Sequence, residues 1–297
     1  MVHTMNLLFK IDKKYALQIN KAVLERVDGI YINKLSESGN EEFIKVGIDL
    51  TEMLNKNEII EDDIVSIVIK LDAYIRKYIT EECVDPILTR IDYKYDLCEE
   101  DKHKREDLFL VLNKLTHKCR FLKKSGKYPL GIKYKNKCIQ INIYDRNEYA
   151  KAKNRKIHEK NVIRYEIQVL NLHLNYNKYK KKIPKELNAY FKVDKRNEYL
   201  KKILKPIIFS GNYYKLREVQ KILKNDSEIT EENKKKLIEF LVRVSKESID
   251  GAKAHYTKFI FDKYIKNLEV LGINPVVIPH NRKSTRIENY VAKIWGE

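Results

Sequence analysis

Three short segments with strictly alternating side chains carry the residues best suited to chemistry: RIDYKYD at 90–96, QINIY at 140–144 and RYEIQ at 164–168. Side chains of a strand point to opposite faces with period two, so one face of each segment holds isoleucines and tyrosines and is expected to be core. The other faces gather Arg90, Asp92, Lys94, Asp96, Gln140, Asn142, Tyr144, Arg164, Glu166 and Gln168. This set could hold a divalent metal ion beside a nucleophile. An antiparallel sheet with one face in water shows the same alternation, so the pattern alone leaves both interpretations open.

The net charge of the chain indicates the kind of partner to expect. The chain has 60 Lys+Arg against 42 Asp+Glu, a formal charge of +18, which favours nucleic acid as the partner. No apolar stretch is long enough to span a bilayer, and the N-terminus lacks the apolar region of a secretory signal. We therefore expect a cytoplasmic protein with no membrane partner. The four cysteines show no close pairing, which favours reduced thiols over disulfides or a zinc site.

Hydrophobic periodicity predicts the element order. Alternating segments predict strands at residues 5–11, 29–35, 42–50, 89–97, 128–134, 138–144 and 162–170, and helical spacing predicts helices at 15–27, 61–78, 105–121 and 145–160. Beyond about residue 180 the strand signals stop and helices follow, one of them starting with Thr230 as its N-cap, before a final extended piece at 272–279. The expected fold is α+β: a mainly antiparallel sheet with helices on one face, followed by a helical C-terminal region. We place one domain at residues 1–183 and a second at 195–297.

The three motifs, in this order, resemble those of rolling-circle replication initiators. Plasmid initiators of the Rep_trans type and replication proteins of the filamentous-phage gene II and X type carry an Arg-[Ile/Leu]-Asp strand, a strand with the nicking tyrosine and an Arg-[aromatic or Val]-Glu strand. The segment LEVLGINPVVIP at 268–279 is also similar to the C-terminal end of the phage group. Asp96 matches the plasmid group better. The His-hydrophobe-His pair of the wider endonuclease group is missing, so metal binding would depend mainly on carboxylates.

The resemblance implies a DNA nicking and joining enzyme. Tyr144 would attack the phosphodiester, forming a phosphotyrosine and freeing a 3′-hydroxyl that primes a polymerase. Asp92 and Glu166, with Asp96 as a weaker ligand, would hold Mg²⁺ or Mn²⁺. Arg90, Lys94 and Arg164 would bind DNA phosphates or brace the acids. We also consider Tyr149 as a rival nucleophile, and His3 and His173 as further members of the site.

The implied partners are origin DNA, both double- and single-stranded, and a host helicase and polymerase, with a homodimer as one arrangement. One alternative is a non-enzymatic DNA-binding regulator of a plasmid or phage, in which the helical C-terminal region reads duplex DNA. An RNA-binding sheet is disfavoured, because Tyr93, Tyr95 and Tyr165 share the side expected to be core.

Overall fold

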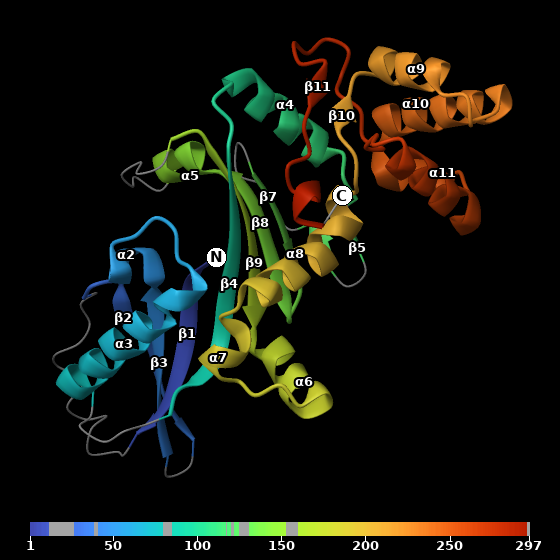
Figure 1. Ribbon diagram of the computed structural model, residues 1–297. Coiled ribbons are helices and arrows are strands. Elements are labelled where there is room, and N and C mark those ends of the chain that lie inside the picture. Colours follow the sequence, from blue (N-terminus) through green and yellow to red (C-terminus); the bar gives the residue numbers. More distant parts are fainter. Residues whose placement is uncertain are drawn as a thin grey trace. The chain divides into compact units, whose positions relative to one another are not determined.

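The computed structural model describes residues 1–11, 27–38, 41–79, 85–116, 118–119, 122–124, 131–152 and 160–295 (Figure 1). Apart from Val27, the helix predicted at 15–27 lies outside the described residues. The strands are β1 (Val2–Ile11), β2 (Ile30–Ser38), β3 (Glu41–Asp49), β4 (Ile87–Cys98), β5 (Lys118–Cys119), β6 (Leu122–Lys124), β7 (Gly131–Lys135), β8 (Ile139–Asp145), β9 (Val162–Leu170), β10 (Tyr213–Tyr214) and β11 (Arg286–Ile287). The α-helices are α2 (Leu50–Leu54), α3 (Ile64–Tyr78), α4 (Lys102–Asn113), α5 (Arg146–Ala152), α6 (Asn171–Lys181), α7 (Leu187–Tyr190), α8 (Val193–Ile208), α9 (Leu216–Asn225), α10 (Glu231–Ala254) and α11 (Lys258–Val270). The short 3₁₀ helices are η1 (Glu61–Asp63) and η2 (Ala292–Trp295).

The main sheet has the strand order β2-β3-β1-β4-β9-β8-β7-β6-β5, and β10 pairs with β11 in a small second sheet. Antiparallel pairing joins β1 to both β3 and β4, β2 to β3, and β6 to β7. The predicted α+β fold with a mainly antiparallel sheet is therefore confirmed.

The chain forms two compact units, each built from separate segments. Unit 1 comprises Met1–Lys94, Lys137–Gln140 and Glu166–Tyr199, and unit 2 comprises Tyr95–Asn136, Ile141–Tyr165 and Leu200–Glu297. Strands β4, β8 and β9 each contribute residues to both units. The predicted division into one domain at residues 1–183 and another at 195–297 stays a prediction.

In unit 1, α2 contacts β1, β3 and α3 (Figure 1). The isoleucines and valine of β3 that point inward, Ile44, Val46 and Ile48, are fully buried. The apolar side of β4 contacts α7 and α8: the Tyr93 hydroxyl donates to the Tyr190 carbonyl at 2.7 Å, and its ring stacks on Tyr199 with centroids 5.3 Å apart. These contacts hold the part of β4 that carries Asp92.

In unit 2, α9 and α11 pack against α10. The predicted N-cap of α10 is confirmed, since the Thr230 side chain accepts a hydrogen bond from the backbone of Asn233. The helix predicted at 105–121 was too long: α4 begins after its cap, Asp101, and ends at Asn113. After α4, Thr116 makes tertiary contacts in place of helical hydrogen bonds. The Thr116 hydroxyl donates to Asp250, and the Thr116 carbonyl accepts from the Tyr134 hydroxyl at 2.7 Å.

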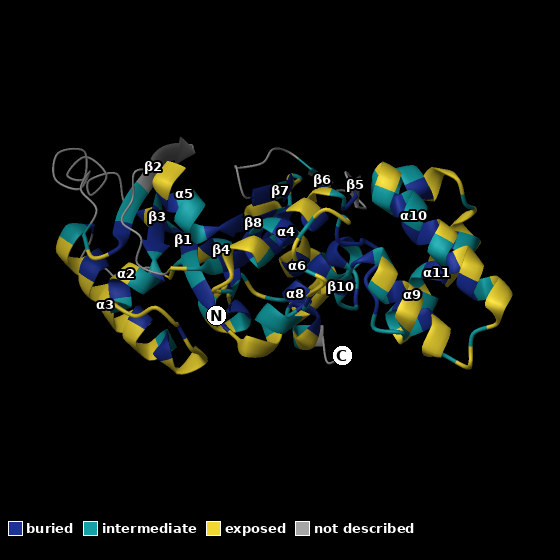
Figure 2. Cartoon of the chain, turned by 90° about the horizontal axis from the view of Figure 1, so that it is seen from above, coloured by how far each residue is buried: buried dark blue, intermediate teal, exposed yellow. Residues whose placement is uncertain are grey.

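The polar side of the motif strands is buried. Four of its charged residues are each at most 5% exposed: Asp92, Lys94, Arg164 and Glu166. By contrast, α3 has a clearly exposed side (Figure 2). A sheet side in contact with water, the simpler interpretation of the alternation, does not describe these positions. Buried charges need partners, because an ionised group that loses water without gaining a partner costs several kcal/mol.

Candidate metal centre

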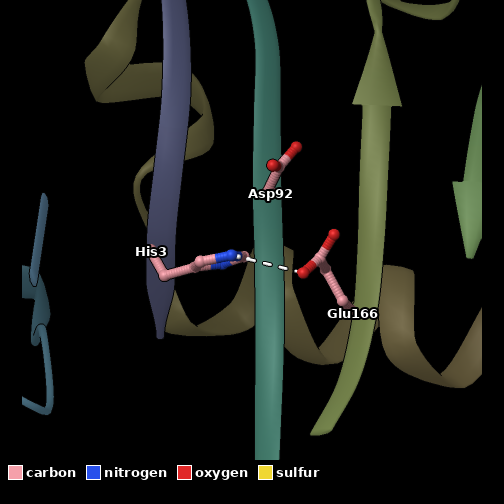
Figure 3. Close-up of side chains that lie close together, drawn as sticks. All are labelled: His3, Asp92 and Glu166. Carbon is pink, nitrogen blue, oxygen red and sulfur yellow. Dashed lines mark ion pairs between the residues drawn. The ribbon is translucent and has the colours of Figure 1, made fainter. Parts of the chain in front are cut away.

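Three neighbouring strands bring together His3, Asp92 and Glu166, which all belong to unit 1 (Figure 3). His3 lies on β1, Asp92 on β4 and Glu166 on β9, and one ligand atom from each lies within 4.8 Å of the others. The His3 Nε2 atom is 3.3 Å from Glu166 Oε2. It is the one group of at least three His, Cys, Asp or Glu side chains with such spacing in the described part of the chain.

A break in the strand register explains how His3 reaches this site. Val2 pairs with Tyr93 but Thr4 pairs with Asp92, so the register of β1 on β4 shifts by one residue at His3. In a regular strand, His3 and Thr4 would point to opposite faces. Here the Thr4 hydroxyl donates to Asp92 while His3 faces Glu166. A β-bulge redirects a side chain in this way, and bulges are frequent beside active sites.

Asp92 is the most enclosed member of the cluster, with no exposed surface. Arg90 Nε donates to its Oδ1 at 2.8 Å, and Arg90 Nη2 and the Thr4 hydroxyl both donate to Oδ2. Burial raises the pKa of Asp92; the Arg90 guanidinium opposes this rise, and the Glu166 carboxylate adds to it. Although burial alone would lower the pKa of Arg90, Asp92 raises it. The site therefore contains two buried carboxyl groups and one neighbouring cation.

Glu166 and His3 form the second half of the cluster. Gln168 Nε2 donates to Glu166 Oε1 at 2.5 Å and approaches Asp92 Oδ2 at 3.4 Å, so it links the two carboxyl groups. The Nδ1 atom of His3 is buried and has no hydrogen-bond partner among the described residues. Buried polar atoms almost always have partners, so this ring nitrogen leaves hydrogen-bonding or ligand capacity unused beside the two carboxyl groups.

The donor set suits a divalent cation. Two carboxylates and one imidazole are ligands that Mn²⁺ and related first-row ions accept, while Mg²⁺ prefers oxygen alone. Ligands bound at about 2.1 Å lie no more than about 4.2 Å apart, so a pair of ligand atoms at the 4.8 Å limit would close by about 0.6 Å, while His3 Nε2 and Glu166 Oε2, 3.3 Å apart, already lie within that range. A side-chain rotation of this size leaves the strands in place.

Two of the residues predicted to bind metal or DNA form an ion pair with each other. Asp96 and Arg164, both in unit 2, form a bidentate ion pair with distances of 2.6 and 2.7 Å. The Arg164 side chain is only 5% exposed. Lys94, also predicted to bind DNA, is buried and donates to the Asn57 carbonyl at 2.9 Å. The metal role of Asp96 and the DNA contacts of Lys94 and Arg164 stay predictions; Arg90, with a side chain 32% exposed, is the most accessible of these cations.

The predicted nucleophile lies in unit 2, at the end of β8. Tyr144 is 8% exposed, and its ring contacts that of Tyr149 with centroids 4.8 Å apart. The next residue, Asp145, caps α5 by accepting from the backbone of Asn147 at 2.8 Å, and Arg105 Nε donates to its other oxygen at 3.2 Å. These bonds fix the turn at which both tyrosines lie.

The sequence patterns did not identify Thr4 or Gln168 as partners of the cluster, and His3 was only a candidate. Gln168 was visible as a member of the alternating polar face, but no local signal distinguished Thr4 or His3. His173, the other histidine considered, contacts the rings of Tyr176 and Tyr199 with centroid distances of 6.4 and 5.7 Å.

Comparison of the sequence with protein-family models gave no match, and comparison with curated proteins gave no significant match. Among the described residues, no helix is both long and apolar enough to cross a membrane. The case for a function therefore depends on the geometry of the site and on the motifs.

Proposed function

We propose that this protein is a divalent-metal-dependent enzyme that nicks and rejoins DNA to initiate rolling-circle replication. The observation that carries the proposal is the cluster of His3, Asp92 and Glu166 on three adjacent strands, with the orphaned His3 Nδ1 at its edge. The resemblance of the motifs to replication initiators and the charge of +18 support DNA as the substrate.

Each of these residues has a role in the proposal. His3, Asp92 and Glu166 would hold the metal ion, which supplies Lewis-acid polarisation of the phosphate to be cleaved. Gln168 would orient both carboxyl groups, and Arg90, the partly exposed cation beside Asp92, would bind a neighbouring phosphate. Tyr144 would attack the phosphorus through its phenol oxygen, leaving a 5′-phosphotyrosine and a free 3′-hydroxyl.

Nicking of supercoiled plasmid DNA that carries a candidate origin tests this proposal. We expect Mn²⁺-dependent conversion to open circles by the wild type, none in EDTA, and none with the Glu166→Gln variant. Glu148→Gln, at a half-buried carboxylate of α5 outside the cluster, is the matched control and should nick normally. Nicking that persists in Glu166→Gln or in EDTA contradicts the metal mechanism.

The nucleophile is tested separately, because Tyr144 and Tyr149 share one ring contact. Tyr144→Phe should abolish nicking and leave DNA binding unchanged, since only the attacking oxygen is lost, while Tyr149→Phe should keep activity. The opposite result would assign the reaction to Tyr149.

A specific observation favours a second candidate, the non-enzymatic DNA-binding regulator. Asp92 already accepts hydrogen bonds from Arg90 and Thr4, so the polar network can be purely structural. In that case the protein binds DNA equally well with Mn²⁺ or EDTA and never cleaves it.

A further inference from the structure

The helix that follows the Glu166 strand has one anchored side and one exposed side. Leu174 and Asn177 of α6 are buried, and Asn177 Nδ2 donates to the hydroxyls of Tyr190 at 3.1 Å and Tyr199 at 3.0 Å. On the other side, Leu172, Tyr176 and Tyr179 are 51%, 54% and 66% exposed. Their spacing of four and three residues places them in one row along the helix.

Lysines surround this row. Between residues 167 and 185 the chain has five lysines and no acidic residue: Lys178, Lys180, Lys181, Lys182 and Lys185. The first four are exposed. The Lys181 ammonium lies 5.9 Å from the centre of the Tyr176 ring, and the Lys178 ammonium lies 5.9 Å from that of Tyr179. The aromatic rings and the cations therefore share one surface.

The helix dipole accounts for lysines near the C-terminal end of α6, but it does not account for exposed tyrosines. A surface that only needed solubility would not leave two aromatic rings and a leucine in water. An unbalanced positive charge fits a polyanion. Exposed rings fit unpaired bases, which stack on aromatic side chains, whereas paired bases in a duplex are already stacked.

We propose that the exposed side of α6, formed by Leu172, Tyr176, Tyr179, Lys178 and Lys181, binds single-stranded DNA. The inference rests on the proposed function in that nicking and strand displacement create such DNA. Bases stack on Tyr176 and Tyr179, and the phosphates between them contact Lys178 and Lys181. Because α6 begins directly after β9, this surface holds a strand in the same unit as the metal centre (Figure 1).

The test measures fluorescence anisotropy of a labelled oligothymidylate of about 20 nucleotides, which exceeds the usual site size, with full-length protein in EDTA. Replacing both tyrosines, Tyr176→Ala with Tyr179→Ala, should weaken binding about tenfold or more, since each ring loses a stacked base. The paired Phe replacements keep the rings and should bind within about twofold of wild type. Phe259→Ala, at an aromatic residue of α11 that is 75% exposed, is the matched control and should bind like wild type.

The lysines are tested by salt dependence. Lys178→Gln with Lys181→Gln should lower the slope of log affinity against log salt by about 1.4, because each phosphate contact on a single strand contributes about 0.7. Lys235→Gln with Lys266→Gln removes the same charge from exposed positions of α10 and α11 and should leave the slope within error. Equal losses in both pairs would show that only net charge matters and would overturn the inference.

Two further results would also overturn the inference. One is unchanged oligothymidylate binding by the Tyr→Ala pair. The other is that this pair still binds DNA normally but no longer binds anionic phospholipid vesicles. The experiments distinguish failure of the α6 inference from failure of the proposed function. If the wild type cleaves with Mn²⁺ but the Tyr→Ala pair binds normally, only the α6 surface is wrong. If the Tyr→Ala pair loses binding but the wild type never cleaves, only the nicking function is wrong.

Discussion

The Glu166→Gln substitution should have opposite effects on stability with and without metal. Donor atoms of Asp92 and Glu166 lie within 4.8 Å, at which two unit charges repel by about 3.5 kcal/mol for an effective dielectric constant of about 20. The substitution removes this repulsion. It also weakens the contact with His3 and one hydrogen bond with Gln168, which together contribute roughly 2–3 kcal/mol. Without metal, we therefore expect the variant to be as stable as wild type or about 1 kcal/mol more stable.

Metal should reverse this order. At a Mn²⁺ concentration about 100 times its Kd, binding stabilises the wild type by about 2.7 kcal/mol, which raises Tm by about 5 °C in a chain of this size. The variant has lost one carboxylate ligand and should show almost no shift.

Thermal unfolding of both proteins in EDTA and in Mn²⁺ measures the effect, with Glu148→Gln as a control that should respond like wild type. An absence of any Mn²⁺ shift in the wild type would contradict a metal ion held by Glu166. So would a loss of more than about 3 kcal/mol by the variant in EDTA, which would mark Glu166 as a structural residue.

We expect three other results, which concern the His3 ligand, the ion pair of Asp96 with Arg164, and the bonds of Asp107. Calorimetry should show tighter binding of Mn²⁺ than of Mg²⁺, and His3→Ala should weaken Mn²⁺ by tenfold or more while changing Mg²⁺ less, because Mg²⁺ gains little from imidazole; equal losses would contradict this. In urea unfolding, Asp96→Ala should cost about 3 kcal/mol, since it leaves the buried Arg164 charge without this partner, and adding Arg164→Met should recover part of the loss; additive costs would contradict a coupled pair. Although burial raises the pKa of the Asp107 carboxyl, its bonds with Ser284 and Arg282 outweigh burial and lower the pKa. The stabilisation by Asp107 is therefore complete above about pH 4 and is lost as the pH falls through the lowered pKa. The Asp107→Asn variant should be less stable than wild type at neutral pH, and its Tm should fall less steeply below about pH 4. An unchanged dependence of Tm on acid pH would contradict this.

Local patterns in the sequence predicted much of the fold. The period-two alternation identified the strands that carry Asp92, Tyr144 and Glu166, and the hydroxyl at Thr230 identified the start of α10. Both signals depend on neighbours along the chain, which is why a single sequence reveals them. The helix predicted at 105–121 went wrong where tertiary contacts, such as that of Thr116 with Asp250, replace helical bonds.

The composition of the candidate site was harder to predict. His3 joins the cluster through a register shift between β1 and β4. The paired residues, such as Thr4 and Asp92, are about 90 positions apart in the sequence, so no local period encodes the register. The ion pair of Asp96 with Arg164 also joins two neighbouring strands, β4 and β9, that are far apart in the sequence. Alternation placed both residues on the polar side but could not say which charges pair with each other and which remain to bind a metal.

The most direct test of the central claim is the trapping of a covalent protein–DNA adduct. Single-stranded oligonucleotides covering a candidate origin are labelled at the 3′ end, incubated with protein and Mn²⁺, and separated on a denaturing gel. We expect the label to migrate with the wild-type protein, and not to do so in EDTA, with Glu166→Gln or with Tyr144→Phe. Adduct formation that continues in EDTA or in Glu166→Gln would contradict a metal-centred nicking site at His3, Asp92 and Glu166.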